Sequence, residues 1–184
     1  MMAENQTVRR EPSPRPALRI DDSNIRWMPF GHLAEANPDG SHPSDGLTYW
    51  VLGVNQARQT VDILFKQDAG VRCRPHRHVG PTDTMVLEGQ HNNFKYEDGK
   101  WKLVQERPPG FLAYSEGDHF HIEQGGPEGT IVHLHMVAVN GLIWEVLARD
   151  NSVVASARIE DFQAVLDYQS GKTGELKLRE GSSL

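Results

Sequence analysis

Residues 72–90 read RCRPHRHVGPTDTMVLEGQ and carry the strongest chemical signal in the chain. Two histidines, His76 and His78, stand one residue apart and are followed by a Gly-Pro turn and an apolar run that closes on glycine. Residues i and i+2 of a β-strand project from the same face, so both imidazoles can reach one ion. Neutral imidazole nitrogen binds iron, zinc, nickel, copper and manganese. The alternative is a solvated loop pair in a basic stretch that also contains Arg74.

Two further histidine pairs share this spacing. His119 and His121 lie in GDHFHIE, and His133 and His135 lie in TIVHLHMVAV. Antiparallel sheets can bring such distant segments together inside a barrel. Six of the nine histidines therefore form three His-x-His pairs in predicted strands or at their edges, which points to metal binding more strongly than one pair would.

The third pair has a competing explanation. His133 and His135 alternate with apolar residues along their predicted strand. If the more apolar face is the core, the two imidazoles look outward or into a subunit interface, and contact with substrate or with the metal ligands is the alternative. The remaining histidines fall in turns or at hairpin ends, where we expect them to be exposed: His32, His42 and His91.

Length and charge limit the class of protein. A chain of 184 residues is long enough for one domain with its own core. Its 19 basic and 25 acidic residues give a net charge of −6, so we expect no nucleic-acid partner. There is no long apolar run for a membrane, and MMAENQTVRREPSPRP lacks the apolar core of a signal peptide. The single cysteine, Cys73, suits a reducing compartment, and we expect a soluble cytoplasmic protein.

Short apolar runs of strand length alternate with Gly- and Pro-rich turns through the middle of the chain. NNFKY and WKLVQE flank Glu97-Asp98-Gly99, which is a hairpin signal. Many short strands with few helical stretches indicate an antiparallel sandwich or barrel. The other predicted strands are residues 47–54, 60–66, 83–90, 129–139 and 142–148.

The two ends of the chain differ from this pattern. Residues 1–17 combine charge with three prolines and are predicted to form a flexible arm, which could instead cross onto a second subunit. Residues 18–155 form the predicted barrel. Residues 156–171 have apolar positions three to four apart and a final glycine, so they predict a helix. The polar residues 172–184 are expected to form a frayed tail.

Taken together, Gly70, His76-Arg77-His78 and Val86-Leu87-Glu88-Gly89 resemble the first motif of the cupin superfamily. SEGDHFH, residues 115–121, loosely resembles the second motif. HRHVGPTDTMVLEG and the downstream GLIWEVLARDNSVVAS are similar to the acetylacetone-cleaving dioxygenases and the dihydroxyacetophenone dioxygenases, over about residues 45–165. The resemblance implies an all-β, single-domain cupin jelly roll, a double-stranded β-helix barrel with a short C-terminal helix.

The resemblance also implies a mononuclear metal, Fe(II) first, with zinc, nickel or manganese as alternatives. By position, His76 and His78 match the first two ligands. His121 is favoured as the third because HIE resembles the His-x-Glu of related cupins, while spacing leaves His119 open. Many cupins carry a glutamate ligand four residues after the second histidine. Here that position is Thr82, which agrees with the three-histidine dioxygenases and argues against the four-ligand cupins.

The activity implied is dioxygen-dependent cleavage of a carbon–carbon bond in a small carbonyl compound, such as a β-diketone or a hydroxyketone. Two other classes remain: a non-catalytic metal- or ligand-binding sensor, and a sugar-epimerase-like cupin that uses a histidine base without metal. Cupin subunits commonly pair through sheet edges, so we expect a homodimer. Glu116 or Glu123 could orient the metal-binding imidazoles. Candidates for the substrate pocket or for contacts to the ligands are Arg74, Thr82, Asp83, His133 and His135.

Overall fold

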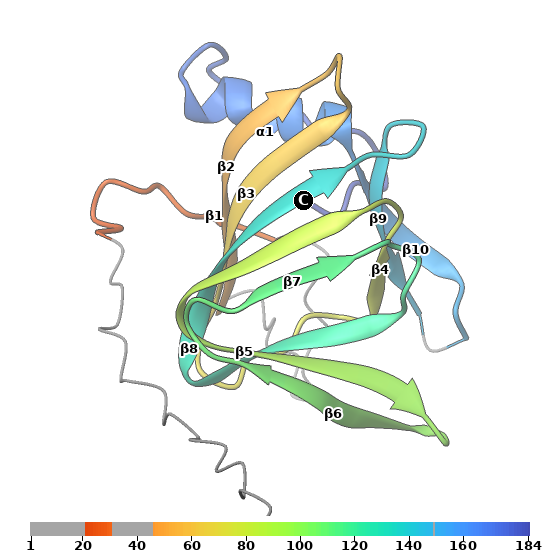
Figure 1. The fold of residues 1–184 in the computed structure, drawn as a ribbon. Helices are drawn as coiled ribbons and strands as arrows, with labels where there is room; N and C mark the ends of the chain where they lie inside the picture. The colour runs from red at the N-terminus through yellow and green to blue at the C-terminus, as the bar shows by residue number, and fades with distance from the viewer. Residues whose placement is uncertain (1–20, 31–45, 149) are drawn as a thin grey trace, which may run out of the picture.

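Figure 1 shows the computed structural model of the chain, in which a strongly curved sheet curls into a half-barrel. The arm expected at residues 1–17 lies outside the described residues, as do His32 and His42. The described residues are 21–30, 46–148 and 150–184.

The described part of the chain forms ten strands and one helix. The helix, α1 (Ile159–Gln169), packs against β2, and no helix in the described ranges is long and apolar enough to cross a membrane. In chain order the strands are β1 (Met28–Pro29), β2 (Leu47–Asn55), β3 (Thr60–Gln67), β4 (His76–His78), β5 (Thr82–Glu97), β6 (Lys100–Arg107), β7 (Leu112–Ser115), β8 (His121–Val137), β9 (Leu142–Leu147) and β10 (Val153–Arg158).

The long strand β8 connects the two halves of the barrel. The strands run in the order β1-β2-β3-β8-β4-β9-β10, and β5 pairs with β6, β7 and β8. The C-terminal half of β8 pairs with β3 and β5, whereas its N-terminal half pairs with β5 and β4. These pairings are antiparallel. The mostly β architecture with a short C-terminal helix confirms the predicted fold class.

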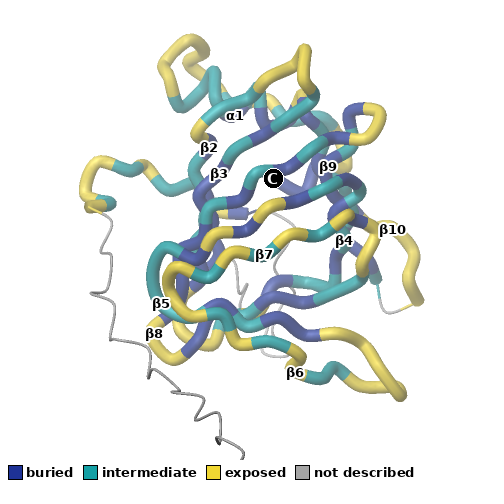
Figure 2. The backbone as a smooth tube through the Cα atoms, in the orientation of Figure 1, coloured by how far each residue is buried: buried dark blue, intermediate teal, exposed yellow. Residues whose placement is uncertain are grey.

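Inward-facing residues alternate with outward-facing residues along the long strands, as a half-buried sheet requires. The register places Tyr49 opposite Phe65 and Phe65 opposite Val132, so one row across β2, β3 and β8 fills the interior with large apolar side chains. Figure 2 shows buried segments along these strands and exposed segments at the hairpin tips. The buried inward side chains include Leu47, Tyr49, Val51, Val61, Ile63, Phe65, Val132, Leu134 and Met136.

Two strands are longer than the sequence predicts. Residues 83–90 and the NNFKY run form the single strand β5, and β8 begins at His121 instead of at residue 129. The glycine-rich stretches between them are bulges, with register shifts in the β5–β8 ladder. Gly89 has a φ of 65°, and a Cβ there would lie 2.1 Å from the carbonyl oxygen of Gly129. Because both strands continue past the bulge, His121 comes to lie opposite β4.

The C-terminal region also differs from expectation. α1 is shorter than the predicted helix at 156–171, because residues 153–158 pair with β9 as β10. The expectation that residues 172–184 fray is wrong. Ser183 is fully buried, and its hydroxyl accepts a hydrogen bond from the indole N–H of Trp144 at 2.8 Å. Leu184 is buried as well and belongs to the hydrophobic core.

Arg179 anchors this terminal segment. Its Nε donates a hydrogen bond to Oδ2 of Asp161 at 2.9 Å, and its Nη2 donates to Ser156. Asp161 is only 2% exposed, and the same carboxylate oxygen accepts the backbone N–H of Arg158 at the start of α1. A buried carboxylate needs such partners because it has lost its hydration. Specific contacts of polar side chains therefore hold the end of the tail, although residues 172–175 are exposed.

We expect Arg179→Met to lower the free energy of unfolding by roughly 1–3 kcal/mol, because buried Asp161 loses a charged hydrogen-bond donor. Urea unfolding followed by circular dichroism measures the change. Lys177→Met is the matched control, since the Lys177 side chain is 79% exposed and pairs only with exposed Glu175. Equal stability of the two variants would contradict the anchoring role.

Candidate metal centre

β4 turns two imidazoles into the barrel. His76 pairs with Val146 of β9 on one side and with His121 of β8 on the other, and His78 pairs with Trp144. Both histidine side chains are buried. Arg77 between them faces outward and forms ion pairs with Glu145 and Asp118. The i, i+2 geometry predicted from the sequence is therefore present, with both imidazoles on the inner face.

His121 joins this pair from β8. The ring centroids of His76 and His121 are 4.4 Å apart, those of His76 and His78 are 5.2 Å apart, and those of His78 and His121 are 5.4 Å apart. His119 is exposed and touches the cluster only through its carbonyl group. The structure thus brings His121, and not the alternative His119, to the other two imidazoles.

Contacts behind the rings fix which nitrogen faces the cluster. Nδ1 of His76 donates to the carbonyl of Arg74 at 2.9 Å, and Nδ1 of His121 donates to the carbonyl of His119 at 2.8 Å. A carbonyl oxygen only accepts, so the proton of each ring lies on Nδ1 and the lone pair on Nε2. Nδ1 of His78 lies 3.2 Å from the hydroxyl of Thr82. This arrangement, with Nε2 free and Nδ1 held by the protein, is typical of metal-binding histidines.

Burial keeps two of these imidazoles uncharged. Burial, and next the neighbouring His121, lower the pKa of His76 from 6.5 to about 4. Burial, followed by His76, lowers the pKa of His78 well below 6.5. A buried imidazolium would lack hydration, so the neutral form is favoured. The neutral form is also the one that binds a metal.

Glu123 adds a carboxylate that the sequence interpretation did not place among the ligands. Its Oε2 lies 3.7 Å from Nε2 of His76, and its Oε1 lies 3.8 Å from Nε2 of His121. Burial by itself raises the pKa of Glu123. The neighbouring His91, followed by His121, outweighs burial, so the pKa stays well below its usual value. An ionised carboxylate therefore lies beside the imidazoles.

These four side chains fit a transition-metal ion. One ligand atom from each of His76, His78, His121 and Glu123 lies within 4.8 Å of the others, and this is the one such group found among the described residues. Three imidazole nitrogens with one carboxylate oxygen suit iron, manganese, nickel or zinc better than calcium or magnesium, which prefer oxygen ligands. Thr82 is not a carboxylate, as the sequence interpretation stated, but a different residue, Glu123, offers a carboxylate beside the imidazoles. The carboxylate comes from β8, two residues after His121, on the same strand face.

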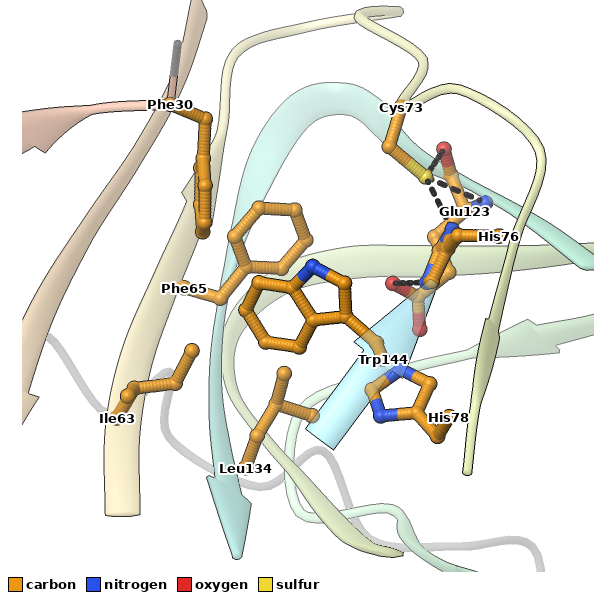
Figure 3. Close-up of a pocket in the computed structure, with 9 residues that line it drawn as sticks. All are labelled: Phe30, Ile63, Phe65, Cys73, His76, His78, Glu123, Leu134 and Trp144. Atoms are coloured by element: carbon orange, nitrogen blue, oxygen red, sulfur yellow. Dashed lines mark hydrogen bonds and ion pairs between the residues drawn. The ribbon is translucent and has the colours of Figure 1, made fainter. Parts of the chain in front are cut away.

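A small cavity adjoins the cluster (Figure 3). The imidazoles of His76 and His78 and the carboxylate of Glu123 lie at one end of the cavity, and aromatic and aliphatic side chains line the other end. The cavity holds about 20 Å³ of space for the centre of a water-sized molecule, enough for about one water. The lining residues are Phe30, Ile63, Phe65, Cys73, His76, His78, Glu123, Leu134 and Trp144.

The other candidate residues have different positions. Thr82 is buried and touches the ring of His78. Arg74 contributes its carbonyl group to His76, while its side chain is half-buried and lines no part of the cavity. Asp83 is exposed on the opposite face of β5, as strand alternation requires. Of Thr82, Arg74 and Asp83, only Thr82 therefore contacts one of the clustered imidazoles through its side chain.

The third histidine pair lies outside the cavity. His133 and His135 both contact Oδ1 of Asp62, at 3.1 and 2.9 Å, on the outer face of the sheet. Neither lines the cavity, and their outward position agrees with the first of the two interpretations of the sequence. The expectation that His91 is exposed is wrong, since it has no exposed surface and its Nε2 lies 3.2 Å from Glu123. Its position before the NNFKY run suggested a hairpin end, but β5 continues through it.

Comparison with known proteins supports the fold. No family model matches the sequence, and no curated protein matches it. An acetylacetone dioxygenase from Acinetobacter johnsonii is 16% identical, with a TM-score of 0.58 over 90% of this chain and 97% of that one. A protein of Methylibium petroleiphilum PM1 with a provisional acetylacetone dioxygenase name is 17% identical, with a TM-score of 0.59 over 84% and 96%. An RmlC-like cupin from Ralstonia eutropha JMP134 is 19% identical, with a TM-score of 0.59 over 88% and 91%.

The lowered pKa of His76 predicts acid sensitivity of the metal-free protein. Between pH 6.5 and about 4 the unfolded chain binds a proton that the folded chain excludes, so the free energy of unfolding falls as the pH falls. Each such group contributes up to about 1.4 kcal/mol per pH unit. Urea titrations at several pH values should show a shallower slope for His76→Gln than for wild type. His119→Gln is the exposed control, and an unchanged slope in His76→Gln would refute the assignment.

Proposed function

We propose that this chain, which has the cupin fold, is a mononuclear metal-dependent dioxygenase that cleaves a carbon–carbon bond in a small carbonyl compound. A β-diketone or a hydroxyketone is the substrate class that we favour. The proposal rests on one observation. Nε2 of His76 and Oε2 of Glu123 face each other at a distance of 3.7 Å. Both atoms are acceptors in the protonation states described above. Buried acceptors that face each other repel unless a cation lies near them.

The protein's own residues would hold and orient this cation. His76, His78 and His121 offer Nε2, and Glu123 offers a carboxylate oxygen. Backbone carbonyls and the hydroxyl of Thr82 fix the rings from behind, which limits their rotation. Iron(II), with zinc, nickel or manganese as alternatives, would supply Lewis acidity and, for iron, the redox chemistry that dioxygen requires.

The lining of the cavity favours a small, uncharged and largely apolar substrate, which would have to displace side chains because the cavity has room for about one water. Among the described residues, its lining contains no lysine or arginine, and its one carboxylate is that of Glu123. An anionic substrate would therefore meet an ionised carboxylate without a compensating cation from the lining. Phe30, Phe65 and Trp144 supply an apolar wall against which an alkyl or aryl group can pack.

The same features separate the alternatives. A metal-independent, epimerase-like cupin would use an imidazole as a base, but it would leave the facing acceptors of His76 and Glu123 without a cation. A sugar nucleotide would also require cationic side chains for its phosphates, and the cavity lining has none. A metal-binding sensor fits the cluster equally well. Consumption of dioxygen distinguishes an enzyme from a sensor.

The proposal includes a cytoplasmic homodimer. β7 pairs only with β5 among the described strands, so its other edge is open. Leu112 and Tyr114 on this strand are 72% and 65% exposed. An open edge with exposed apolar side chains is a surface that a second copy can cover.

We expect protein purified without added metal or chelator to contain close to one transition-metal ion per chain, and His76→Ala to lose it. His133→Ala should keep the metal, because His133 lies on the outer face beside Asp62. Elemental analysis measures the metal, and an oxygen electrode with a β-diketone measures the activity. Metal without oxygen uptake would favour the sensor, and no metal after anaerobic iron loading would refute the proposal.

Replacing an apolar side chain of the cavity lining with a smaller one should change which substrate sizes the enzyme prefers. Leu134→Ala enlarges the cavity, so kcat/KM for a diketone with a longer alkyl group should rise roughly tenfold relative to a shorter one. The substitution also costs about 2–5 kcal/mol of stability, so the assay belongs well below the melting temperature. Leu52→Ala is the control, since Leu52 is exposed on β2. An unchanged ratio in Leu134→Ala would exclude this cavity as the substrate pocket.

A further inference from the structure

His91 is a buried histidine that the proposed metal centre does not use. It lies on β5, opposite Gly125 of β8 and Arg107 of β6, and has no exposed surface. Neither of its ring nitrogens has a partner with full hydrogen-bond geometry among the described residues. Burying an imidazole whose nitrogens lack well-formed hydrogen bonds costs free energy, so its position requires an explanation.

The imidazole of His91 lies beside the carboxylate of Glu123. Nε2 of His91 lies 3.2 Å from Oε1 of Glu123, closer than the nitrogens of His76 and His121 are to this carboxylate. Oε1 is shared between His91 and His121, while Oε2 faces His76. The carboxylate thus lies between His91 and the imidazole cluster. His91 contacts it from outside the cluster and is not itself part of the group of four.

The strand register explains why these two side chains meet. β5 and β8 are neighbours, with Asn93 opposite Glu123 and His91 opposite Gly125. Directly opposed residues share a face, so His91 and Glu123 lie on the same face, one row apart along the sheet. The contact between Nε2 of His91 and Oε1 of Glu123 at 3.2 Å agrees with this register.

We propose that His91 is a positioning residue that holds the Glu123 carboxylate toward the three metal-binding imidazoles. This inference rests on the proposed metal centre. Without His91, the close contacts of the Glu123 carboxylate among the described residues would be with His76 and His121, which are themselves proposed ligands, and the attraction of Arg107 would draw the side chain away from them. With His91, one carboxylate oxygen is held at the back, and the other stays near His76. His91 of β5 thereby keeps the carboxylate of Glu123, on β8, in place as the fourth member of the site.

The test is the affinity of the metal-free protein for Co²⁺, measured by calorimetry, together with the visible absorption of the bound ion. His91→Phe keeps a ring of similar size but removes the nitrogens. We expect it to weaken Co²⁺ binding about 10–100-fold and to change the visible spectrum, because Glu123 is no longer oriented. His91→Gln should restore most of the affinity, since its amide N–H can replace Nε2.

A double-mutant cycle tests whether His91 acts through Glu123. In a Glu123→Gln background, His91→Phe should weaken binding less than twofold further. An equal loss in both backgrounds, or full affinity in His91→Phe, would overturn the inference. If His91→Phe does not fold, as judged by circular dichroism, His91→Leu against His91→Gln makes the same comparison.

If the proposed metal centre itself does not exist, the same measurements give a different result. In that case the wild-type protein binds no Co²⁺, or the His78→Ala variant binds Co²⁺ as tightly as the wild type does. If wild type binds one ion, His78→Ala loses it and His91→Phe has no effect, then only the role of His91 is overturned.

Discussion

The central constraint in this structure is the gathering of two buried imidazoles and one partly buried imidazole around an ionised carboxylate. Neutral His76 turns its Nε2 lone pair toward Oε2 of Glu123 at 3.7 Å, where neither atom can donate a proton to the other. Such an arrangement is unfavourable without a cation. It persists because the barrel holds each ring from behind, through the carbonyls of Arg74 and His119 and the hydroxyl of Thr82.

Strand continuity brings these groups together. β8 runs through a glycine-rich bulge from the apolar sheet into the half of the barrel that contains β4. If the chain turned away at Gly129, His121 and Glu123 would not lie beside His76. The bulge depends on the close approach of Gly89 to Gly129, where no side chain fits. The site therefore depends on backbone geometry at Gly89 and Gly129, the second of which lies about fifty residues after β4 along the chain.

Much of the fold could be predicted, because alternation of apolar and polar residues is local information. The strands at 47–54, 60–66 and 142–148 were predicted close to their observed bounds. The errors share one cause. Glycine-rich stretches were interpreted as turns although they are bulges, and this hid the length of β5 and β8 and the burial of His91. Likewise, the polar tail at 172–184 looked solvated because composition does not reveal that Ser183 meets Trp144.

By itself, the sequence determined the residue types of the site and their local geometry, since His-x-His on a strand places two imidazoles on one face. It also determined that the chain is mostly β, through the period-two pattern. Only the tertiary structure decided that His121 and not His119 joins the cluster, that Glu123 adds a carboxylate and that His91 stands behind it. These outcomes depend on strand register, because a shift of one residue turns every side chain to the other face. Register is set by bulges and partners distant in sequence, which no local pattern encodes.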